Sequence, residues 1–250
     1  MKALKFGVEI ELGGESRRKA SEIIANYFGT SNTYTGTYYD TWTAYDRIGR
    51  KWNVMSDSSV HAGTQSCEVV TPLLTYDDME DLQNVVRELR KNGFKANSSC
   101  GIHVHVDNSG MDAKQIKNLV NFVGGREEII YRALKIRENG REHWCQKADK
   151  NFRLKLNKIR NLTFESIKKT WYQTQSFCDA ASYSHYDSSR YHLLNLHSMW
   201  QGKGIEFRCF NGTTHAGEIK AYVQFCLAMV AKAKKLKWAQ SRQIPHRDSL

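Results

Sequence analysis

Two stretches of the sequence alternate apolar and polar residues without a break, and this pattern constrains the fold more than any other feature. They are 5–13 (KFGVEIELG) and 101–107 (GIHVHVD). Successive side chains of a β-strand point to opposite faces, so each stretch is expected to be a strand with one buried face. Shorter runs predict further strands at 66–71, 191–196 and 205–210, and one or two hairpins at 33–56.

Helices are expected between these strands, from apolar residues at helical spacing and from capping patterns. Two helices are expected at 16–28 and 216–238. Two more should begin at the pairs Thr75/Asp78 and Asp112/Gln115, and several helices should lie within the charged stretch 127–175. Most of these helices do not connect neighbouring strands at the spacing of a parallel sheet. We therefore predict an α+β fold, a mostly antiparallel sheet with helices packed on one face, in a single domain that covers 1–250.

The composition argues against a disordered protein and against a membrane protein. With 40% hydrophobic residues and only 2 Pro, the chain can bury a core and lacks a Pro-rich linker. No apolar run approaches the roughly 18 residues of a membrane span. Glu9 and Glu11 interrupt the N-terminal stretch in which a signal peptide would be apolar. We therefore expect a cytoplasmic protein that does not bind a membrane.

The six cysteines are too far apart in the sequence for a CxxC pair, which argues against a thiolate zinc site. A disulfide framework is not expected at this chain length. Cys67, Cys209 and Cys226 have apolar neighbours and are expected to be small core residues.

The formal net charge of +11 is unevenly distributed along the chain. Residues 114–170 contain 15 basic and 6 acidic side chains, and residues 232–250 contain 6 and 1. Such segments form either solvated helices or a surface for nucleic acid. We favour the first interpretation, because no helix-turn-helix, zinc-finger or RNA-recognition motif accompanies the charge.

Ionisable residues occupy the polar faces of four predicted strands. They are Glu9 and Glu11, Glu68, His103 and His105, and Glu206 and Arg208. Side chains two positions apart on a strand lie about 7 Å apart on one face, so Glu9 and Glu11 repel unless water or a cation separates them. Each pair alone is common on a solvated strand, but if the four strands share a sheet, the residues converge on one surface. Carboxylates with an imidazole favour Mg²⁺ or Mn²⁺, and three or more Glu residues suit two ions better than one.

Six short motifs follow one another along most of the chain. They are residues 6–12, 57–59, 68–72, 101–107, 190–196 and 205–208. In this order they resemble the putative amidoligase family, which belongs to the carboxylate–amine ligase superfamily with glutamine synthetase and glutamate–cysteine ligase. The resemblance implies a sheet of the glutamine synthetase catalytic type. The family usually has Asp-Gly-Ser where this chain has Asp57-Ser58-Ser59, and the basic helical insertion at about 127–175 matches no part of it.

The resemblance also implies roles for individual residues. Metal-ligand positions fall on Glu9, Glu11, Glu68, His103 and Glu206. Nucleotide-binding positions fall on His105, Arg190, Asn195 and Arg208, and the two arginines would stabilise the transferring phosphoryl group. The implied cofactors are ATP and two Mg²⁺ or Mn²⁺ ions.

The implied reaction joins a carboxylate to an amine, either in small molecules or in a peptide. The carboxylate attacks the γ-phosphorus of ATP, and the amine then displaces phosphate from the acyl phosphate. Asp57 or Glu68 is the expected base for the amine. The aromatic residues between Tyr34 and Tyr45 are expected either to cover the substrate or to pack a hairpin.

Two other functions stay open from the sequence. His103 and His105 with several carboxylates also suit a Zn²⁺-dependent hydrolase, although no further His or Cys stands at a motif spacing. The basic segments 114–170 and 232–250 suit a nucleic-acid-binding module. ATP dependence separates the ligase from the hydrolase, and a steep salt dependence of DNA or RNA binding would identify the module.

Overall fold

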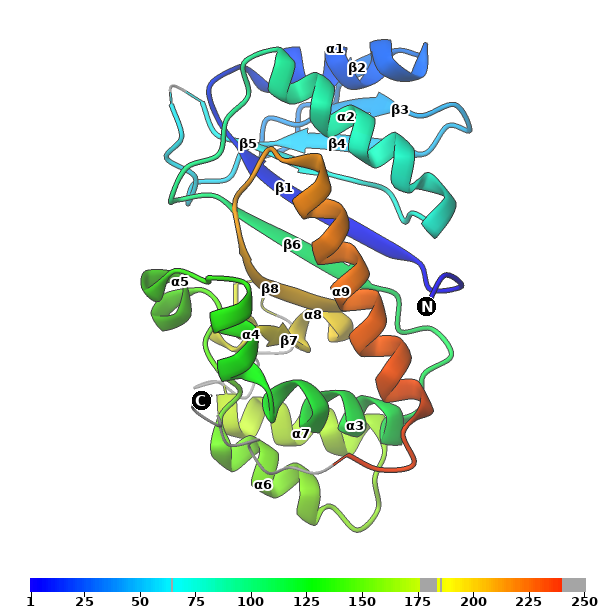
Figure 1. Ribbon diagram of the computed structural model, residues 1–250, viewed down its shortest axis with the longest axis vertical. Helices are drawn as coiled ribbons and strands as arrows, with labels where there is room; N and C mark the ends of the chain where they lie inside the picture. Colours follow the sequence, from blue (N-terminus) through cyan, green and yellow to red (C-terminus); the bar gives the residue numbers. More distant parts are fainter. Residues whose placement is uncertain (64, 176–183, 185, 240–250) are drawn as a thin grey trace, which may run out of the picture. The chain divides into compact units, whose positions relative to one another are not determined.

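The computed structural model describes residues 1–63, 65–175, 184 and 186–239 of the 250-residue chain. Its strands form one sheet in the order β2-β3-β4-β5-β1-β6-β8-β7 (Figure 1). The strands are β1 (Phe6–Leu12), β2 (Asn32–Tyr34), β3 (Trp42–Tyr45), β4 (Lys51–Met55), β5 (Cys67–Val70), β6 (Gly101–Val106), β7 (Leu194–Asn195) and β8 (Ile205–Asn211). The pairings of β1 with β5, β2 with β3, β3 with β4, β4 with β5 and β7 with β8 are antiparallel, which confirms the predicted α+β class.

Helices lie between the strands, mostly where periodicity and capping patterns predict them, although the helix at His197–Trp200 and the short 3₁₀ helix at Ser188–Arg190 are not expected from the sequence. The helices are α1 (Arg17–Phe28), α2 (Met79–Lys91), α3 (Ala113–Gly124), α4 (Glu127–Ala133), α5 (Glu138–His143), α6 (Lys150–Lys158), α7 (Phe164–Gln175), α8 (His197–Trp200) and α9 (Ala216–Lys235), with short 3₁₀ helices at Tyr76–Asp78 and Ser188–Arg190. Both predicted capping boxes are present. In the second, the Gln115 N–H donates to Asp112 Oδ1 at 2.7 Å, and the Asp112 N–H donates to Gln115 Oε1 at 3.0 Å.

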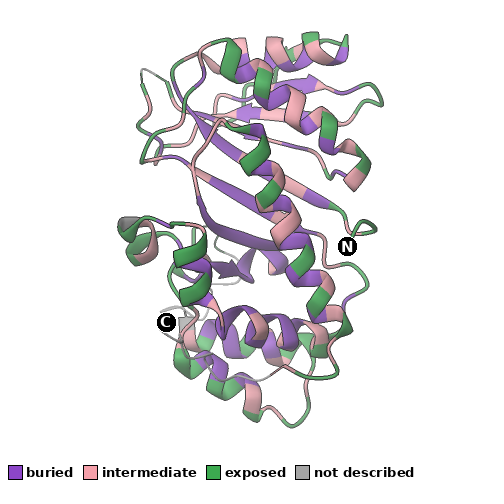
Figure 2. Cartoon of the chain, in the orientation of Figure 1, coloured by how far each residue is buried: buried purple, intermediate pink, exposed green. Residues whose placement is uncertain are grey.

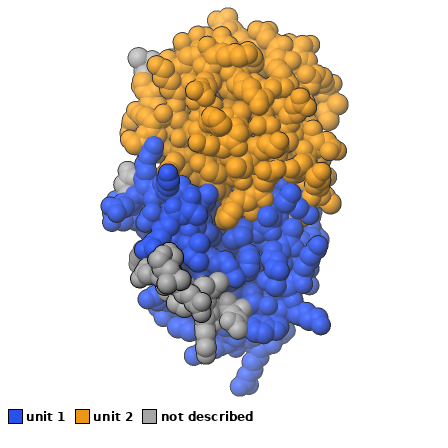
Figure 3. Space-filling view, viewed as in Figure 1, with its two compact units in different colours: residues 1, 105–209, 226–250 blue, residues 2–104, 210–225 orange. Residues whose placement is uncertain are grey.

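The chain divides into two compact units (Figure 3). The strand unit comprises residues 2–104 and 210–225, and the helical unit comprises residue 1, residues 105–209 and the chain from residue 226 onward. The chain passes from one unit to the other within β6, within β8 and within α9. The single domain expected for 1–250 stays a prediction.

In the strand unit, helices cover the apolar face of the strands (Figures 1 and 2). The Ser16 side chain caps α1 by accepting from the Lys19 N–H at 3.2 Å, and Gly29 ends α1 with φ 68°, a conformation that glycine adopts without a steric penalty. The helix packs on β3 and β4, where the rings of Phe28 and Trp52 lie 5.5 Å apart. The apolar side of β1 is buried, as its alternation predicts, and its glutamates therefore lie on the opposite face.

In the helical unit, the charged stretch 127–175 contributes to a core. Helices α3, α6 and α7 pack together, and the rings of Phe152 and Trp171 meet edge to face at 5.1 Å. Arg153 is buried and donates from Nη1 to the Gly124 carbonyl at 2.7 Å. The helical content expected for this stretch is confirmed.

The strand expected at 191–196 is shorter in the structure than in the sequence analysis. It is reduced to Leu194–Asn195, and α8 begins two residues later. The Asn195 side chain explains the early end: its Oδ1 accepts from the backbone N–H of His197 at 2.8 Å and of Ser198 at 3.4 Å, which turns the chain into the helix.

The described cysteines behave as core residues. Cys67, Cys100, Cys145, Cys209 and Cys226 are all buried and free of disulfides, and Cys178 lies outside the described residues. Burial raises the pKa of Cys67 to about 12 and that of Cys145 to about 11, so these thiols stay protonated. None of the described helices combines the length and the apolar character that crossing a membrane requires.

Candidate active site

Two glutamates face each other across neighbouring strands of the strand unit. In the antiparallel pairing of β1 with β5, Glu11 lies directly opposite Glu68. Side chains at such positions have their Cβ atoms about 4.5–5.5 Å apart, and like charges there are destabilising. Asp57 joins them, because carboxylate oxygens of Glu11, Asp57 and Glu68 all lie within 4.8 Å of one another.

His103 of β6 completes this acidic cluster, which we define as Glu9, Glu11, Asp57, Glu68 and His103. Its Nδ1 lies 3.0 Å from Glu9 Oε2, and its Nε2 lies 3.7 Å from Glu11 Oε1. The imidazole is therefore held between two carboxylates, and it is only 7% exposed. The strand unit thus brings together four of the five predicted metal-ligand residues and the predicted base Asp57.

Gly101 keeps this cluster compact. Its backbone N–H donates to Glu11 Oε2 at 2.5 Å, which fixes one carboxylate oxygen. A Cβ atom at this position would lie 3.3 Å from His103 Nε2 and 3.4 Å from Glu11 Oε2. Any side chain at position 101 would therefore press on two potential ligand atoms.

The cluster contains two overlapping sets of three potential ligands. Glu9, Glu68 and His103 form one set, and Glu11, Asp57 and Glu68 form the other, each with its ligand atoms within 4.8 Å of one another. Oxygen donors with a single imidazole are the chemistry that Mg²⁺ and Mn²⁺ accept in proteins. The donor set therefore fits hard divalent cations, and Glu68 is common to both sets.

Asp57 has a defined orientation, although it is followed by Ser58 and not by the glycine that the family resembled by this chain usually has. Asp57 Oδ1 accepts from the Ser59 N–H at 2.7 Å and from the Ser59 hydroxyl at 2.6 Å. Its own N–H donates to Ser66 Oγ at 3.2 Å. These bonds form an Asx turn that presents the carboxylate to Glu11 and Glu68.

A second group, the arginine cluster, lies in the helical unit and consists of His105, Arg190, Asn195, Glu206 and Arg208. Arg208 Nη1 donates to Glu206 Oε1 at 2.6 Å, and Asn195 Nδ2 donates to Glu206 Oε2 at 2.7 Å. Glu206 is 3% exposed and Arg208 is 8% exposed. Glu206, a predicted metal ligand, is thus held by a guanidinium and an amide.

The two predicted phosphate-binding arginines both lie near the ring of Tyr191. The guanidinium carbon of Arg190 lies 5.7 Å from the centre of the Tyr191 ring, and that of Arg208 lies 5.8 Å from it. The structure therefore brings both arginines to the same part of the helical unit. Arg190 also lies 5.9 Å from the ring centre of Tyr186.

His105 has defined neighbours on both sides of its ring. Its Nδ1 lies 3.2 Å from the Lys203 carbonyl oxygen and 3.2 Å from Ser198 Oγ. A carbonyl can only accept, so this contact requires the proton to be on Nδ1. Nε2 lies 4.0 Å from Glu206 Oε1.

Several residues of these clusters give little or no signal in the sequence. The Gly101 N–H and the Lys203 carbonyl act through the backbone, so their side chains give no signal. Ser198 follows the last motif residue of the 190–196 stretch, and an ordinary serine on a helix does not stand out. Tyr191 lies inside that motif and could have been found from its place next to Arg190.

Of the aromatic residues expected either as a lid or as hairpin packing, one pair packs within the hairpin. The rings of Tyr34 and Trp42 pack 5.1 Å apart across β2 and β3. Tyr38 is 95% exposed, while the Tyr39 carbonyl accepts from the Ser56 N–H at 2.8 Å, next to Asp57. The first pair is hairpin packing, and a lid role for Tyr38 and Tyr39 stays a prediction.

The chain matches a known protein family. The model of a family described as putative amidoligase enzyme matches residues 2–230, which include both clusters and all the motifs. No curated protein matches the chain.

Proposed function

We propose that this chain, which belongs to the amidoligase family, is an ATP-dependent ligase that joins a carboxylate to an amine through an acyl phosphate. The observation that carries the proposal is the position of Glu11 directly opposite Glu68, with Asp57 beside both. Carboxylates so close together are unfavourable unless a cation or a proton lies between them. Phosphoryl transfer from ATP is a reaction for which such a cation is needed.

The acidic cluster would hold the metal ions. Glu9, Glu68 and His103 would bind one ion, and Glu11, Asp57 and Glu68 a second. Bound Mg²⁺ or Mn²⁺ would offset the negative charge of the phosphate oxygens. The Gly101 N–H and the contact of His103 with Glu9 orient the ligands before an ion arrives.

The arginine cluster would bind the phosphate groups. Arg208 is held by Glu206, and Glu206 is held by Asn195, so the guanidinium has a fixed direction. A preorganised guanidinium stabilises charge that develops on a transferring phosphoryl group. Arg190, which also lies near the Tyr191 ring, would bind a further phosphate oxygen.

The proposed reaction has two steps. A carboxylate oxygen of the substrate bonds to the γ-phosphorus, the bond from this phosphorus to the bridging oxygen breaks, and ADP leaves. The amine nitrogen then bonds to the acyl carbon, inorganic phosphate leaves, and the amine proton passes to a solvent molecule. The Ser59 N–H and hydroxyl fix the direction of the Asp57 carboxylate, and a role of Asp57 as the base is the alternative to its role as a ligand.

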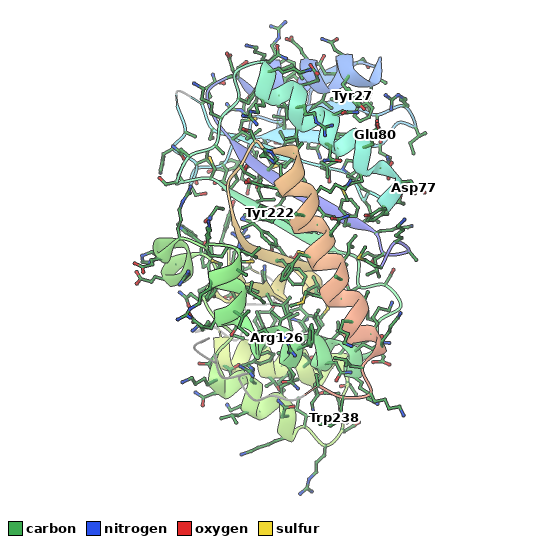
Figure 4. All side chains as sticks on the ribbon, in the orientation of Figure 1. Tyr27, Asp77, Glu80, Arg126, Tyr222 and Trp238 are labelled. Atoms are coloured by element: carbon green, nitrogen blue, oxygen red, sulfur yellow. The ribbon has the colours of Figure 1, made fainter. Side chains whose placement is uncertain are left out.

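Trapping with hydroxylamine tests this proposal. The protein is incubated with Mg²⁺, ATP and a pool of carboxylic acids, with hydroxylamine as the amine, and ADP and hydroxamate are measured. We expect both products to depend on ATP and to be lost in Glu68→Gln. Glu80→Gln, which changes an exposed carboxylate on α2 (Figure 4), is the matched control and should keep the activity.

Two results would contradict the ligase. Release of ADP at the same rate in wild type and in Glu68→Gln would exclude a role for the acidic cluster. Cleavage of amides or esters without ATP, sensitive to the same substitution, would identify the metal-dependent hydrolase instead.

Arg208→Lys separates turnover from nucleotide binding. Lysine keeps the charge but offers one mobile point charge in place of a planar fork, so we expect turnover to fall by about 10²- to 10³-fold. Nucleotide affinity, measured by titration at fixed Mg²⁺, should change little. Unchanged turnover would leave Arg208 as a structural partner of Glu206.

A further inference from the structure

A ladder of amide side chains in the helical unit brings the two basic segments of the sequence together. It consists of three hydrogen bonds from α3 to backbone carbonyls: Gln115 Nε2 to Lys234 at 3.3 Å, Asn118 Nδ2 to Leu236 at 2.8 Å, and Asn121 Nδ2 to Ala239 at 3.3 Å. Asn118 is 3% exposed and Asn121 is 1% exposed. Asn121 also exchanges hydrogen bonds with Asn157 of α6 at 2.9 Å. The main chain from 234 to 239 is therefore fixed along α3.

The segment fixed in this way turns charged and aromatic side chains outward. We call 232–239 the lysine–tryptophan segment. Its Lys232, Lys235 and Lys237 are exposed, and its Trp238 is 66% exposed (Figure 4). An isolated exposed indole is ordinary, but here it stands next to several lysines on a backbone that buried amides hold in place.

Two lysines of α3 emerge beside this segment. At 100° per residue, Lys114 points between the directions of Asn118 and Asn121, and Lys117 lies on the other side of Asn121. Lys114 is exposed and Lys117 is half-buried. Residues of 114–170 and of 232–239, far apart in the sequence, thus contribute to one basic surface.

We propose that this surface, formed by the lysine–tryptophan segment with Lys114 and Lys117, binds a single-stranded nucleic acid. Lysines can neutralise phosphates, and an exposed indole can stack on an unpaired base. The proposal is independent of the ligase activity. It gives the basic segments a role that the acidic and arginine clusters do not.

Other polyanions fit the surface less well. A membrane-binding helix turns its apolar face outward, whereas Val230 and Ala233 of α9 are buried within the protein. An acidic peptide would pair with the lysines but would offer no nucleobase on which the Trp238 indole could stack. A double-stranded nucleic acid keeps its bases stacked inside, out of reach of the indole.

Fluorescence anisotropy with a labelled 20-nucleotide oligothymidine, repeated over a range of salt concentrations, tests the role of the lysines. Each phosphate contact contributes about 0.7 to the slope of log affinity against log salt for a single strand, so Lys235→Gln/Lys237→Gln should lower this slope by about 1.4. Lys51→Gln/Arg90→Gln removes two exposed charges from the strand unit and should leave the slope unchanged. No binding by the wild type, or an equal loss in the control, would overturn the proposal.

Trp238 separates a nucleic-acid surface from a general attraction to negative charge. Trp238→Ala should weaken binding about 5- to 100-fold without changing the salt slope, and Trp238→Phe should restore most of the affinity. Equal affinity of wild type and Trp238→Ala would overturn the proposal. Tighter binding to poly-glutamate or to vesicles with anionic lipids than to the oligonucleotide would also overturn it.

Asn118→Ala tests whether the ladder matters. This variant keeps every lysine and Trp238 but removes the hydrogen bond to Leu236. We expect several-fold weaker binding, with circular dichroism confirming that the helices persist. Unchanged affinity would show that the ladder does not preorganise the surface.

Discussion

The strand unit contains two groups of buried or half-buried charges, and they are built in opposite ways. In the first, which we call the Arg50 network, Arg50 donates from Nε to Asp46 Oδ2 at 2.6 Å and from its Nη atoms to Asp78 at 2.7 and 3.0 Å. In the acidic cluster, a glutamate faces a glutamate. In the first group one guanidinium pairs with both carboxylates and stabilises the fold, whereas the second group places carboxylates next to one another and is proposed to hold a cation.

The pKa values in the Arg50 network show the effect of pairing each carboxylate with the guanidinium. The guanidinium of Arg50 lowers the pKa of Asp78 to about 2, with help from the backbone and side chain of Thr75. The carboxylates raise the pKa of Arg50 in return. Asp78 is also the capping residue at the start of α2, so the network ties the β3–β4 turn to that helix.

The largest effect we predict is on activity, from Glu68→Gln. Because Glu68 belongs to both ligand sets, turnover should fall by at least about 10²-fold, the typical cost of removing one preorganised electrostatic group. The melting temperature without divalent ions should not fall, since the substitution removes a like charge opposite Glu11. A melting temperature lowered by several degrees would show that Glu68 stabilises the fold, as the Arg50 network does.

Arg50→Met should have the opposite result. It leaves Asp46, which is 3% exposed, without its guanidinium, and we expect a loss of about 2 kcal/mol in the free energy of unfolding. Arg47→Met is the matched control. The Arg47–Asp81 ion pair is more exposed. Its loss, together with the loss of the contacts of Arg47 to Tyr27 and Phe28, should therefore lower the free energy of unfolding less than Arg50→Met does. If urea denaturation gives the same loss of unfolding free energy for Arg50→Met and Arg47→Met, the special role of Arg50 is contradicted.

Two carboxyl groups should give stability a pH dependence of opposite sign. The pKa of Asp78 is lowered from 3.8 to about 2, so its contribution is present above about pH 4 and is lost as the pH falls toward 2. Burial raises the pKa of Glu127 from 4.5 to about 7, against the hydrogen bond from the Ala148 N–H and the charges of Arg153 and Lys147. Folding then requires Glu127 to stay protonated, so stability should fall as the pH rises from about 4.5 to 7.

Substitution of each carboxyl group tests the predicted direction in which the free energy of unfolding changes with pH. Glu127→Gln keeps an oxygen for the Ala148 N–H and should flatten the curve of unfolding free energy between pH 4.5 and 7. Asp78→Asn should flatten it between pH 2 and 4. A Glu127→Gln curve that is parallel to that of the wild type would show that Glu127 titrates normally.

The smallest effect should come from Gly101→Ala. The new methyl group would lie 3.3 Å from His103 Nε2, so the ring must move by a few tenths of an ångström, while the N–H to Glu11 remains. Changes next to metal ligands typically cost 10- to 100-fold in affinity, and with this N–H retained we expect about threefold to tenfold weaker Mn²⁺ binding. Unchanged affinity would show that the space around His103 is not needed.

The sequence predicts the faces of the strands well, because alternation records which side is buried. It therefore places Glu9, Glu11, Glu68 and His103 on polar faces. It does not predict the register that sets Glu11 opposite Glu68, since some 55 residues separate them and the pairing depends on the whole sheet. Nor does the sequence show that Glu206 is held by Arg208 and Asn195. A glutamate at a polar position of a strand gives the same alternation whether its side chain binds a metal ion or other side chains.

Backbone partners are the other feature that the sequence does not reveal. Gln115, Asn118 and Asn121 look like ordinary polar residues of a helix, and their partners are carbonyl groups that every residue carries. For the same reason the strand at 191–196 is overestimated, since the capping role of Asn195 appears only when α8 is seen. The residue types of a site are thus easier to predict from the sequence than the hydrogen bonds that orient their side chains.

Direct measurement of Mn²⁺ binding tests the central claim, that the acidic cluster is arranged for divalent cations. Mn²⁺ is added to the protein without nucleotide, and the free ion is followed by its electron paramagnetic resonance signal in wild type, Glu68→Gln and the control Glu80→Gln. We predict saturable binding of two ions to the wild type and the control, and its loss in Glu68→Gln, because Glu68 is common to both ligand sets. No saturable binding to the wild type, or equal binding to Glu68→Gln, would contradict the claim.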